Sequence, residues 1–267
     1  MSGAAGLDLQ ALLPEVIALA RAAGEAAMAI YGRGFSVRAK ADASPVTEAD
    51  DAAEAIILAG LARLTPEVAA ISEEAVARAG SPDPLAPDPL DDTPAFWLVD
   101  PLDGTREFVA RNGEFSVNIA LIRERRPVLG VVHAPVSGIT YLASGPGSAR
   151  VIRANGLSVA IHARAAPESG LVVVSSRSHG DRAALDAYLA EFKLAERRTM
   201  GSAIKFGLVA EGAADLYPRF GPTMEGDTAA GQAILEAAGG SVTTLKGEPL
   251  RYGKPGWRNP DFIARGG

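Results

Sequence analysis

The sequence predicts a mixed α/β protein with an α+β N-terminal half and an α/β C-terminal half. Helical periodicity dominates the first part of the chain, and a block of apolar, β-rich runs follows, up to residue 162. Strand-like and helix-like stretches then alternate between residues 171 and 244, the pattern of α/β organisation. We place the division at the Gly-Pro-Gly stretch, which gives units over residues 1–147 and 148–267. The polar break at 163–169 is the alternative boundary.

Composition and charge exclude several classes of protein. The 267 residues are 48% apolar and 22% charged, which suits a globular protein with a sizeable core. A net charge of −6 argues against a nucleic-acid polymer as partner. The absence of cysteine excludes disulfides, thiolate metal sites and a cysteine nucleophile. The longest uncharged stretch, 127–149, is broken by proline and glycine, and no basic residue precedes Arg21. We therefore expect neither a transmembrane segment nor a signal peptide.

The N-terminal half begins with helices and short strands. We expect, in order, a helix over residues 8–31, a short strand over 35–40, a helix from about Thr47 to Leu64, a strand over 68–72 and a surface loop over 75–94. Thr47 and Asp50 have the spacing of a capping box, so Asp50 has a structural role at the start of the second helix. The strand over 68–72 ends at the pair Glu73-Glu74.

The stretch Phe96-Trp-Leu-Val-Asp100-Pro-Leu-Asp103-Gly-Thr105 predicts a strand, a turn and a short helix. The proline favours a strand end at Asp100, Asp103 then falls in the turn, and Thr105 is a suitable N-cap. Two carboxylates beside free helix amides suit a hard cation and an anion together. The alternative is that both aspartates only stabilise the turn.

The remaining elements follow the same reasoning. We expect β-rich runs over 115–123, 127–133, 139–143 and 148–162, then strands over 171–175, 196–200, 214–217 and 241–244, alternating with helices over 181–192, 202–211 and 227–238.

The motif Asp100-Pro-Leu-Asp-Gly-Thr105 resembles the signature of the inositol-monophosphatase-like, magnesium-dependent, lithium-sensitive phosphatases. The runs from Trp97 to Phe108 and from Arg111 to Leu121 resemble one branch, the 3′(2′),5′-bisphosphate nucleotidases. The resemblance implies a layered α/β/α/β/α sandwich with the site at the junction of the halves. It implies a cytoplasmic enzyme, and it allows a peripheral position on the inner membrane face. Monomer and homodimer both stay open.

The resemblance also implies roles for individual residues. Two or three Mg²⁺ ions would be held by Glu73, Asp100, the Leu102 carbonyl, Asp103 and Asp227. The catalytic residues would be Asp50, Glu73 and Thr105, and the Gly104 and Thr105 amides would bind the phosphate. Each acid has a structural alternative: a helix cap for Asp50, solvated surface for Glu73 and dipole complementarity for Asp227. The family usually has tryptophan where this chain has Gly226.

Substrate recognition is expected from the C-terminal half. The segments Ser176-Arg-Ser-His179, Gly201-Ser202-Ala-Ile-Lys205 and Tyr217-Pro-Arg219 match family positions associated with the nucleotide and its second phosphate. His179, Ser202, Lys205 and Arg219 are therefore the predicted substrate-binding residues. The alternatives are a structural histidine and solvated cations.

Three functions follow as hypotheses. The first is Mg²⁺-dependent removal of the 3′-phosphate from adenosine 3′,5′-bisphosphate or its 5′-phosphosulfate. The second is an inositol-phosphate or sugar-phosphate phosphatase with the same metal site, and the third is a non-catalytic metal- or nucleotide-binding protein.

Overall fold

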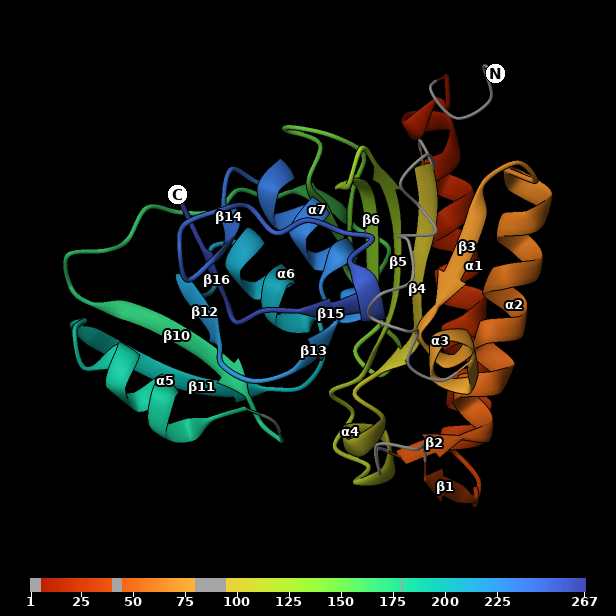
Figure 1. Ribbon diagram of the computed structural model, residues 1–267, viewed down its shortest axis with the longest axis horizontal. Helices are drawn as coiled ribbons and strands as arrows, with labels where there is room; N and C mark the ends of the chain where they lie inside the picture. Colours follow the sequence, from red (N-terminus) through yellow and green to blue (C-terminus); the bar gives the residue numbers. More distant parts are fainter. Residues whose placement is uncertain (1–5, 40–44, 80–94, 179) are drawn as a thin grey trace.

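Two β-sheets and three helical layers alternate in the order α/β/α/β/α, which confirms the predicted sandwich (Figure 1). The structure is a computed structural model that describes residues 6–39, 45–79, 95–178 and 180–267. Helices α1 and α2 cover the outer face of the first sheet, α6 and α7 lie between the sheets, and α5 covers the outer face of the second sheet. The helices are α1 (Leu9–Tyr31), α2 (Glu48–Leu64), α3 (Glu73–Ala79), α4 (Thr105–Val109), α5 (Arg182–Leu189), α6 (Ile204–Ala210), α7 (Ala229–Ala237) and the 3₁₀ turns η1 (Glu225–Asp227) and η2 (Pro255–Trp257).

The first sheet has seven strands in the order β3-β4-β5-β6-β7-β8-β9. Its strands are β3 (Ala69–Ser72), β4 (Ala95–Asp103), β5 (Ser116–Arg123), β6 (Arg126–Ala134), β7 (Ile139–Ala143), β8 (Arg150–Ile152) and β9 (Ser158–Ala160). β3 runs parallel to β4, and the others form an antiparallel meander. The first sheet thus extends to residue 160, beyond the boundary predicted at 147.

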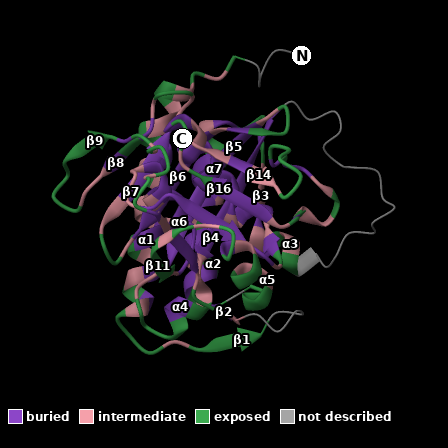
Figure 2. Cartoon of the chain, turned by 90° about the vertical axis from the view of Figure 1, so that its left-hand side faces the viewer, coloured by how far each residue is buried: buried purple, intermediate pink, exposed green. Residues whose placement is uncertain are grey.

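Side chains of the first sheet alternate between two helical layers. Trp97 and Val99 of β4 pack toward α1 and α2, whereas Phe96 and Leu98 pack toward α6 and α7. Because successive side chains point to opposite faces and both faces are covered, residues 95–99 of the strand form an unbroken apolar run. Figure 2 shows the buried residues gathered along the central strands, with β1 and β9 at exposed margins.

The second sheet has the order β11-β10-β12-β16-β14. Its strands are β10 (Leu171–Ser176), β11 (Leu194–Met200), β12 (Leu216–Arg219), β14 (Ser241–Thr244) and β16 (Phe262–Arg265). Two short strand pairs lie apart from both large sheets: β1 (Val37–Ala39) with β2 (Pro45–Thr47), and β13 (Thr223–Met224) with β15 (Arg258–Asn259). The chain leaves β10 through α5 to β11, then returns through α6 to β12 on the other side of β10. Because β10 is parallel to both neighbours, their carboxyl ends meet at one edge.

Helix α7 approaches the first sheet closely at a glycine. A Cβ at Gly130 of β6 would lie 2.4 Å from the Ala230 carbonyl oxygen and 2.9 Å from the Ala233 Cβ, so only glycine fits there without displacing backbone. This contact fixes the start of α7, and Asp227 just before it, against the first sheet, whose strand β4 carries Asp100 and Asp103.

Several sequence-based expectations differ from the structure. The loop expected over 75–94 is wrong at its start, since α3 continues to Ala79; residues 80–94 lie outside the described residues. No element was predicted after residue 244, yet β16 lies inside the second sheet between β12 and β14. In the part of the chain that the structure describes, no helix is both long and apolar enough to span a membrane.

Candidate active site

A β-bulge in β4 turns two aspartates toward the same side of the sheet. Asp100 lies opposite Asn118 and Asp103 opposite Ser116, so between these pairs two residues of β4 face one of β5. Residues three apart in a regular strand point to opposite faces of the sheet. The extra residue of the bulge brings the side chains of Asp100 and Asp103 back to the same face. Pro101 fits this bulge because it lacks a backbone donor. β4 therefore continues to Asp103, and the prediction that the strand ends at Asp100 is wrong.

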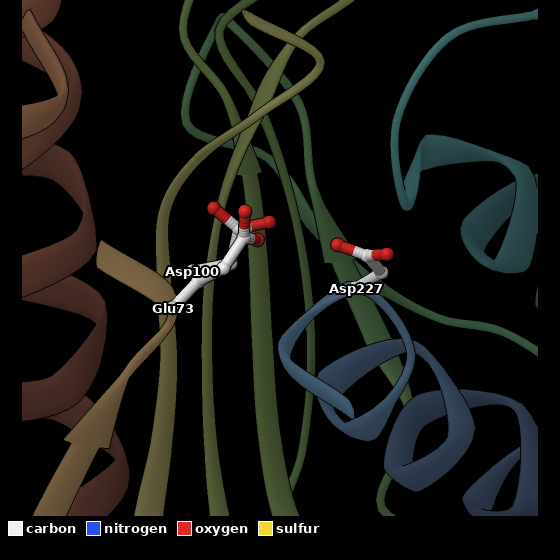
Figure 3. A group of neighbouring side chains, drawn as sticks. All are labelled: Glu73, Asp100 and Asp227. Atoms are coloured by element: carbon white, nitrogen blue, oxygen red, sulfur yellow. The ribbon is translucent and has the colours of Figure 1, made fainter. Parts of the chain in front are cut away.

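Three carboxylates from separate segments converge at the junction of the two sheets (Figure 3). Glu73 is the first residue of α3, Asp100 lies on β4, and Asp227 ends η1 just before α7. Each offers one carboxylate oxygen, and these oxygens lie within 4.8 Å of one another. We refer to these three residues as the acid trio. All three were predicted ligands, and the fold brings them together over about 150 residues of sequence.

Burial and mutual repulsion make the acid trio costly without a cation. Burial raises the pKa of Asp227 well above its ordinary value, and the charges of Glu73 and Asp103 raise it further. The Met224 amide donates to Asp227 Oδ2 at 2.8 Å and only partly opposes this effect. An all-oxygen donor set that repels itself is what a hard divalent cation would stabilise. The residues present therefore fit a metal site.

Asp103 is held beside the acid trio rather than in it. Its Oδ2 accepts from Asn118 Nδ2 at 3.1 Å and from the Ala203 amide at 2.5 Å. Burial raises the pKa of Asp103 to about 6, and the nearby Lys205 ammonium opposes the rise. These bonds tie β4 to the start of α6, so Asp103 joins the halves of the molecule at the site.

A hydrogen-bonded chain links the turn after β4 to helix α2. Thr105 Oγ1 lies 3.1 Å from the Leu102 carbonyl oxygen and 3.2 Å from Asp50 Oδ1. Asp50 Oδ2 in turn accepts from the Thr47 amide at 2.8 Å, which confirms the predicted capping box. Thr105 is not the N-cap of α4 as predicted: it is the first helical residue, and Gly104 is the cap.

Gly104 allows the sharp turn between β4 and α4. Its φ of 91° lies in the left-handed region, and a Cβ there would stand 3.1 Å from the Glu114 carbonyl oxygen. A glycine is therefore needed to place the Gly104 and Thr105 amides next to the carboxylates.

These residues line one cavity of about 400 Å³, which we call the metal pocket. It contains, among others, Glu73, Asp100, Leu102, Asp103, Gly104, Thr105, Ser202, Lys205, Arg219 and Asp227. Asp50 lies behind Thr105, and His179 lies outside the described residues. All the other predicted site residues thus share this pocket.

Lys205 and Arg219 lie in the pocket wall and are almost fully buried, at 3% and 6% exposure. Lys205 Nζ donates to the carbonyl oxygens of Met200 and Ser202 and lies 5.1 Å from the centre of the Tyr217 ring. Burial lowers the pKa of Lys205 to about 8, while Asp103 opposes this. The alternative, that these two cations are merely solvated surface residues, is therefore wrong.

Two glutamates and an asparagine that were not predicted as site residues lie around the pocket, and the glutamates join the two halves. Glu114 binds Arg177 through two bonds of 2.8 and 2.6 Å and accepts from the Gly201 amide at 2.8 Å. Glu107, 3% exposed, accepts from Ser178 Oγ at 2.6 Å. Asn118 was not predicted either, although a polar residue inside an otherwise apolar strand indicates a functional position. Nothing in the local sequence around Glu107 and Glu114 indicates such a position.

A five-layered α/β sandwich with clustered acids between its sheets has the layout of a metal-dependent phosphomonoester hydrolase. The chain belongs to the Inositol monophosphatase family, whose sequence profile matches residues 8–262. The family is metal-dependent, which accords with the acid trio.

Comparison with curated proteins places the chain near one branch of this family. It is 46% identical over 254 residues to the 3′(2′),5′-bisphosphate nucleotidase CysQ of Escherichia coli K12, and the match covers 94% of this chain and 98% of that protein. Identity to CysQ of Salmonella typhimurium LT2 is also 46% over the same coverage.

Among solved structures, CysQ from Bacteroides thetaiotaomicron superposes with a TM-score of 0.78 at 38% identity, covering 94% of this chain and 96% of that one. An IMPase from Thermotoga maritima superposes with a TM-score of 0.73 at 26% identity, covering 93% and 89%. The chain is thus similar both to nucleotidases and to inositol monophosphatases.

Proposed function

We propose that the protein hydrolyses the 3′-phosphate of adenosine 3′,5′-bisphosphate, releasing adenosine 5′-monophosphate and phosphate. The supporting observation is the acid trio, which lies in a pocket that also holds the Gly104–Thr105 turn and two buried cations. The 46% identity to bisphosphate nucleotidases supports this choice of substrate. The 5′-phosphosulfate analogue is the next substrate to test.

The proposed cofactor is Mg²⁺, as two or three ions. Glu73, Asp100, Asp103, Asp227 and the Leu102 carbonyl would hold them, and all five residues line the metal pocket. Magnesium prefers oxygen ligands, lowers the pKa of water and neutralises charge on phosphate oxygens.

The protein residues would orient the reacting groups. We infer that Thr105 donates its hydroxyl proton to Asp50 Oδ1, 3.2 Å away, and thereby presents its oxygen lone pairs to the attacking water. Glu73 would act beside it as the second catalytic carboxylate. The Gly104 and Thr105 amides would donate to the phosphate, and no covalent phospho-enzyme is needed.

The substrate would be recognised by the wall of the metal pocket. Ser202, Lys205 and Arg219 remain the proposed contacts, because they combine a hydroxyl with two buried positive charges. His179 is also proposed as a contact. The cytoplasmic location, the division at residue 147 and the choice between monomer and homodimer stay predictions.

The main rival is an inositol-phosphate phosphatase, which the similarity to inositol monophosphatase structures favours. The test measures phosphate release from adenosine 3′,5′-bisphosphate and from inositol 1-phosphate, with Mg²⁺ and with chelator. We expect a higher kcat/KM for the bisphosphate and no release in chelator. A preference for inositol 1-phosphate would replace the proposed substrate with the rival one.

A further inference from the structure

The chain between β14 and β16 contains a segment that is hydrogen-bonded both to the first sheet and to the turn that carries Asp227. We call its residues 252–259 the bracing segment. The Tyr252 amide donates to the Arg125 carbonyl oxygen at 3.1 Å, and Arg125 Nη2 donates to the Gly253 carbonyl oxygen at 3.1 Å. Arg125 lies in the two-residue turn between β5 and β6, and β5 pairs with β4. The bracing segment is therefore fixed to the sheet that carries Asp100.

The bracing segment also surrounds the carboxylate of Glu225, two residues before Asp227 in η1. The Glu225 side chain is fully buried. Its Oε2 accepts from the Gly253 amide at 2.7 Å, and its Oε1 accepts from the Lys254 amide at 2.9 Å. The Lys254 ammonium lies 2.5 Å from the same Oε1. One carboxylate thus binds two backbone amides and an ammonium of the bracing segment.

Asn259, at the end of the bracing segment, holds the residues on both sides of Asp227. Its Nδ2 donates to the Met224 carbonyl oxygen at 2.8 Å and to Thr228 Oγ1 at 3.0 Å. Met224 also pairs with Arg258 where β13 and β15 run antiparallel. The amide of Met224 is the donor to Asp227 Oδ2, so Asn259 fixes the residue that orients this carboxylate.

The backbone of the bracing segment adopts an unfavourable conformation at Trp257. The φ of Trp257 is 55°, in the left-handed region that bulky residues rarely adopt. Its ring packs edge-on against Phe96 of β4, with the ring centroids 5.9 Å apart. Such strain persists only where the surroundings determine the conformation. The contacts of the bracing segment therefore specify one position for it between β4 and η1.

We propose that Glu225 and Asn259 are positioning residues, which hold Asp227 next to Asp100 and thereby set the affinity of the acid trio for Mg²⁺. The bracing segment is bound to the first sheet, and these two side chains pass its position on to η1. This inference rests on the proposed function, because it takes Asp227 as a metal ligand. The buried pair of Glu225 and Lys254 is a weak source of stability, since desolvation offsets the attraction of the charges. Residues that orient metal ligands commonly change metal affinity ten- to a hundredfold.

The test measures Mg²⁺ binding by calorimetry in the wild type, Glu225→Gln and Asn259→Ala. Glutamine keeps only one acceptor oxygen for the two amides, and alanine removes the bonds of Asn259 without any change in charge. The Kd for Mg²⁺ should rise about tenfold or more in each variant. The Mg²⁺ concentration for half-maximal phosphate release should rise with it, while saturating Mg²⁺ restores most of kcat.

The matched control is Glu211→Gln. Glu211 is another largely buried glutamate paired with a cation, since it accepts from Tyr141 Oη at 2.9 Å and from Arg153 Nη2 at 2.6 Å. It follows the last residue of α6, at the opposite end of that helix from Lys205. All three variants should lose some thermal stability in chelator, but Glu211→Gln should keep the wild-type Kd for Mg²⁺.

An unchanged Kd in Asn259→Ala would overturn the inference, even if Glu225→Gln bound Mg²⁺ more weakly, because loss of the Glu225 charge alone would explain that result. An equal rise of Kd in Glu211→Gln would overturn it too. Asn259→Ala decides by itself if Glu225→Gln does not fold.

Failure of the proposed function would give a different result. If the wild type bound Mg²⁺ but released no phosphate from adenosine 3′,5′-bisphosphate, the proposed substrate would be wrong, and calorimetry would still decide the role of Glu225 and Asn259. If the wild type bound no Mg²⁺, the metal site would fail and this inference with it.

Discussion

Replacing Asp100 with asparagine should shift the stability of the protein in opposite directions with and without magnesium. Asp100 is 3% exposed and belongs to the acid trio. Its Oδ1 accepts from the Leu102 amide at 3.1 Å, and asparagine keeps an Oδ1 acceptor of the same shape. The substitution therefore removes a negative charge while it preserves the local hydrogen bond.

The expected magnitude follows from the spacing of the carboxylates. Two full charges 4.8 Å apart repel by about 3 kcal/mol at an effective dielectric constant of about 20. Burial and the neighbouring charges also raise the pKa of Asp227, which opposes full ionisation of the acid trio, so we take less than the full repulsion. We expect Asp100→Asn to gain about 1–2 kcal/mol in chelator, or a rise in Tm of roughly 2–6 °C.

Magnesium should reverse the order of the two proteins. A ligand at a hundred times its Kd stabilises the folded state by about 2.7 kcal/mol, and the variant should lose much of this increment with one ligand fewer. Phosphate release should fall below detection in the same variant.

The assay is thermal unfolding in chelator and in saturating Mg²⁺, with Asp51→Asn as the matched control. Asp51 follows Asp50 on α2 but is exposed and pairs with Arg38 at the surface, so its loss should change Tm little in either condition. A large loss of Tm by Asp100→Asn in chelator would mean that the acid is structural. A wild-type response of the variant to Mg²⁺ would remove Asp100 from the metal site.

Three further predictions address single positions. Thr105→Ala should lower kcat about a hundredfold or more, because it removes the hydroxyl beside Asp50, whereas Thr105→Ser should retain most activity. If steady-state kinetics showed the same loss of kcat in both variants, a role for the hydroxyl would be excluded. Gly226→Ala should raise the free energy of unfolding by about 0.4–1 kcal/mol, since the added Cβ would lie at an ordinary 3.4 Å from the Asp100 Cβ; a lower denaturation midpoint would contradict this. Burial lowers the pKa of His133 to about 4, so the unfolded chain binds a proton first and the wild type should lose up to about 3 kcal/mol between pH 6.5 and pH 4. His133→Gln should flatten that part of the stability curve, as measured by denaturant unfolding at each pH.

Local chemistry made much of the fold predictable. The helix over 8–31, the capping box of Thr47 and Asp50, and the alternation of strands and helices after residue 171 depend on neighbours a few residues apart. The misassigned positions depend on distant partners. β16 pairs with β12 and β14, and its four residues carry no strong signal of their own.

In the candidate site, too, the residue types could be predicted from the sequence and their arrangement could not. The residue types that chelate a cation were visible in the sequence as acids after strands, and all the predicted ligands that the structure describes line one pocket. Their arrangement was not visible, because it depends on the bulge between Asp100 and Asp103 and on the close packing of α7 at Gly130. Burial also decided the state of Lys205, which from sequence alone was indistinguishable from a surface lysine.

By itself the sequence determined most of the segments that become strands and helices and the side chains that carry the chemistry, since both follow from short-range spacing and residue type. Only the tertiary structure decided that Glu73, Asp100 and Asp227 share one cation-sized space, that Asp103 turns toward α6, and that the bracing segment binds Glu225. The physical reason is that distances between segments far apart in the chain are set by how whole layers pack, and no local pattern encodes that packing.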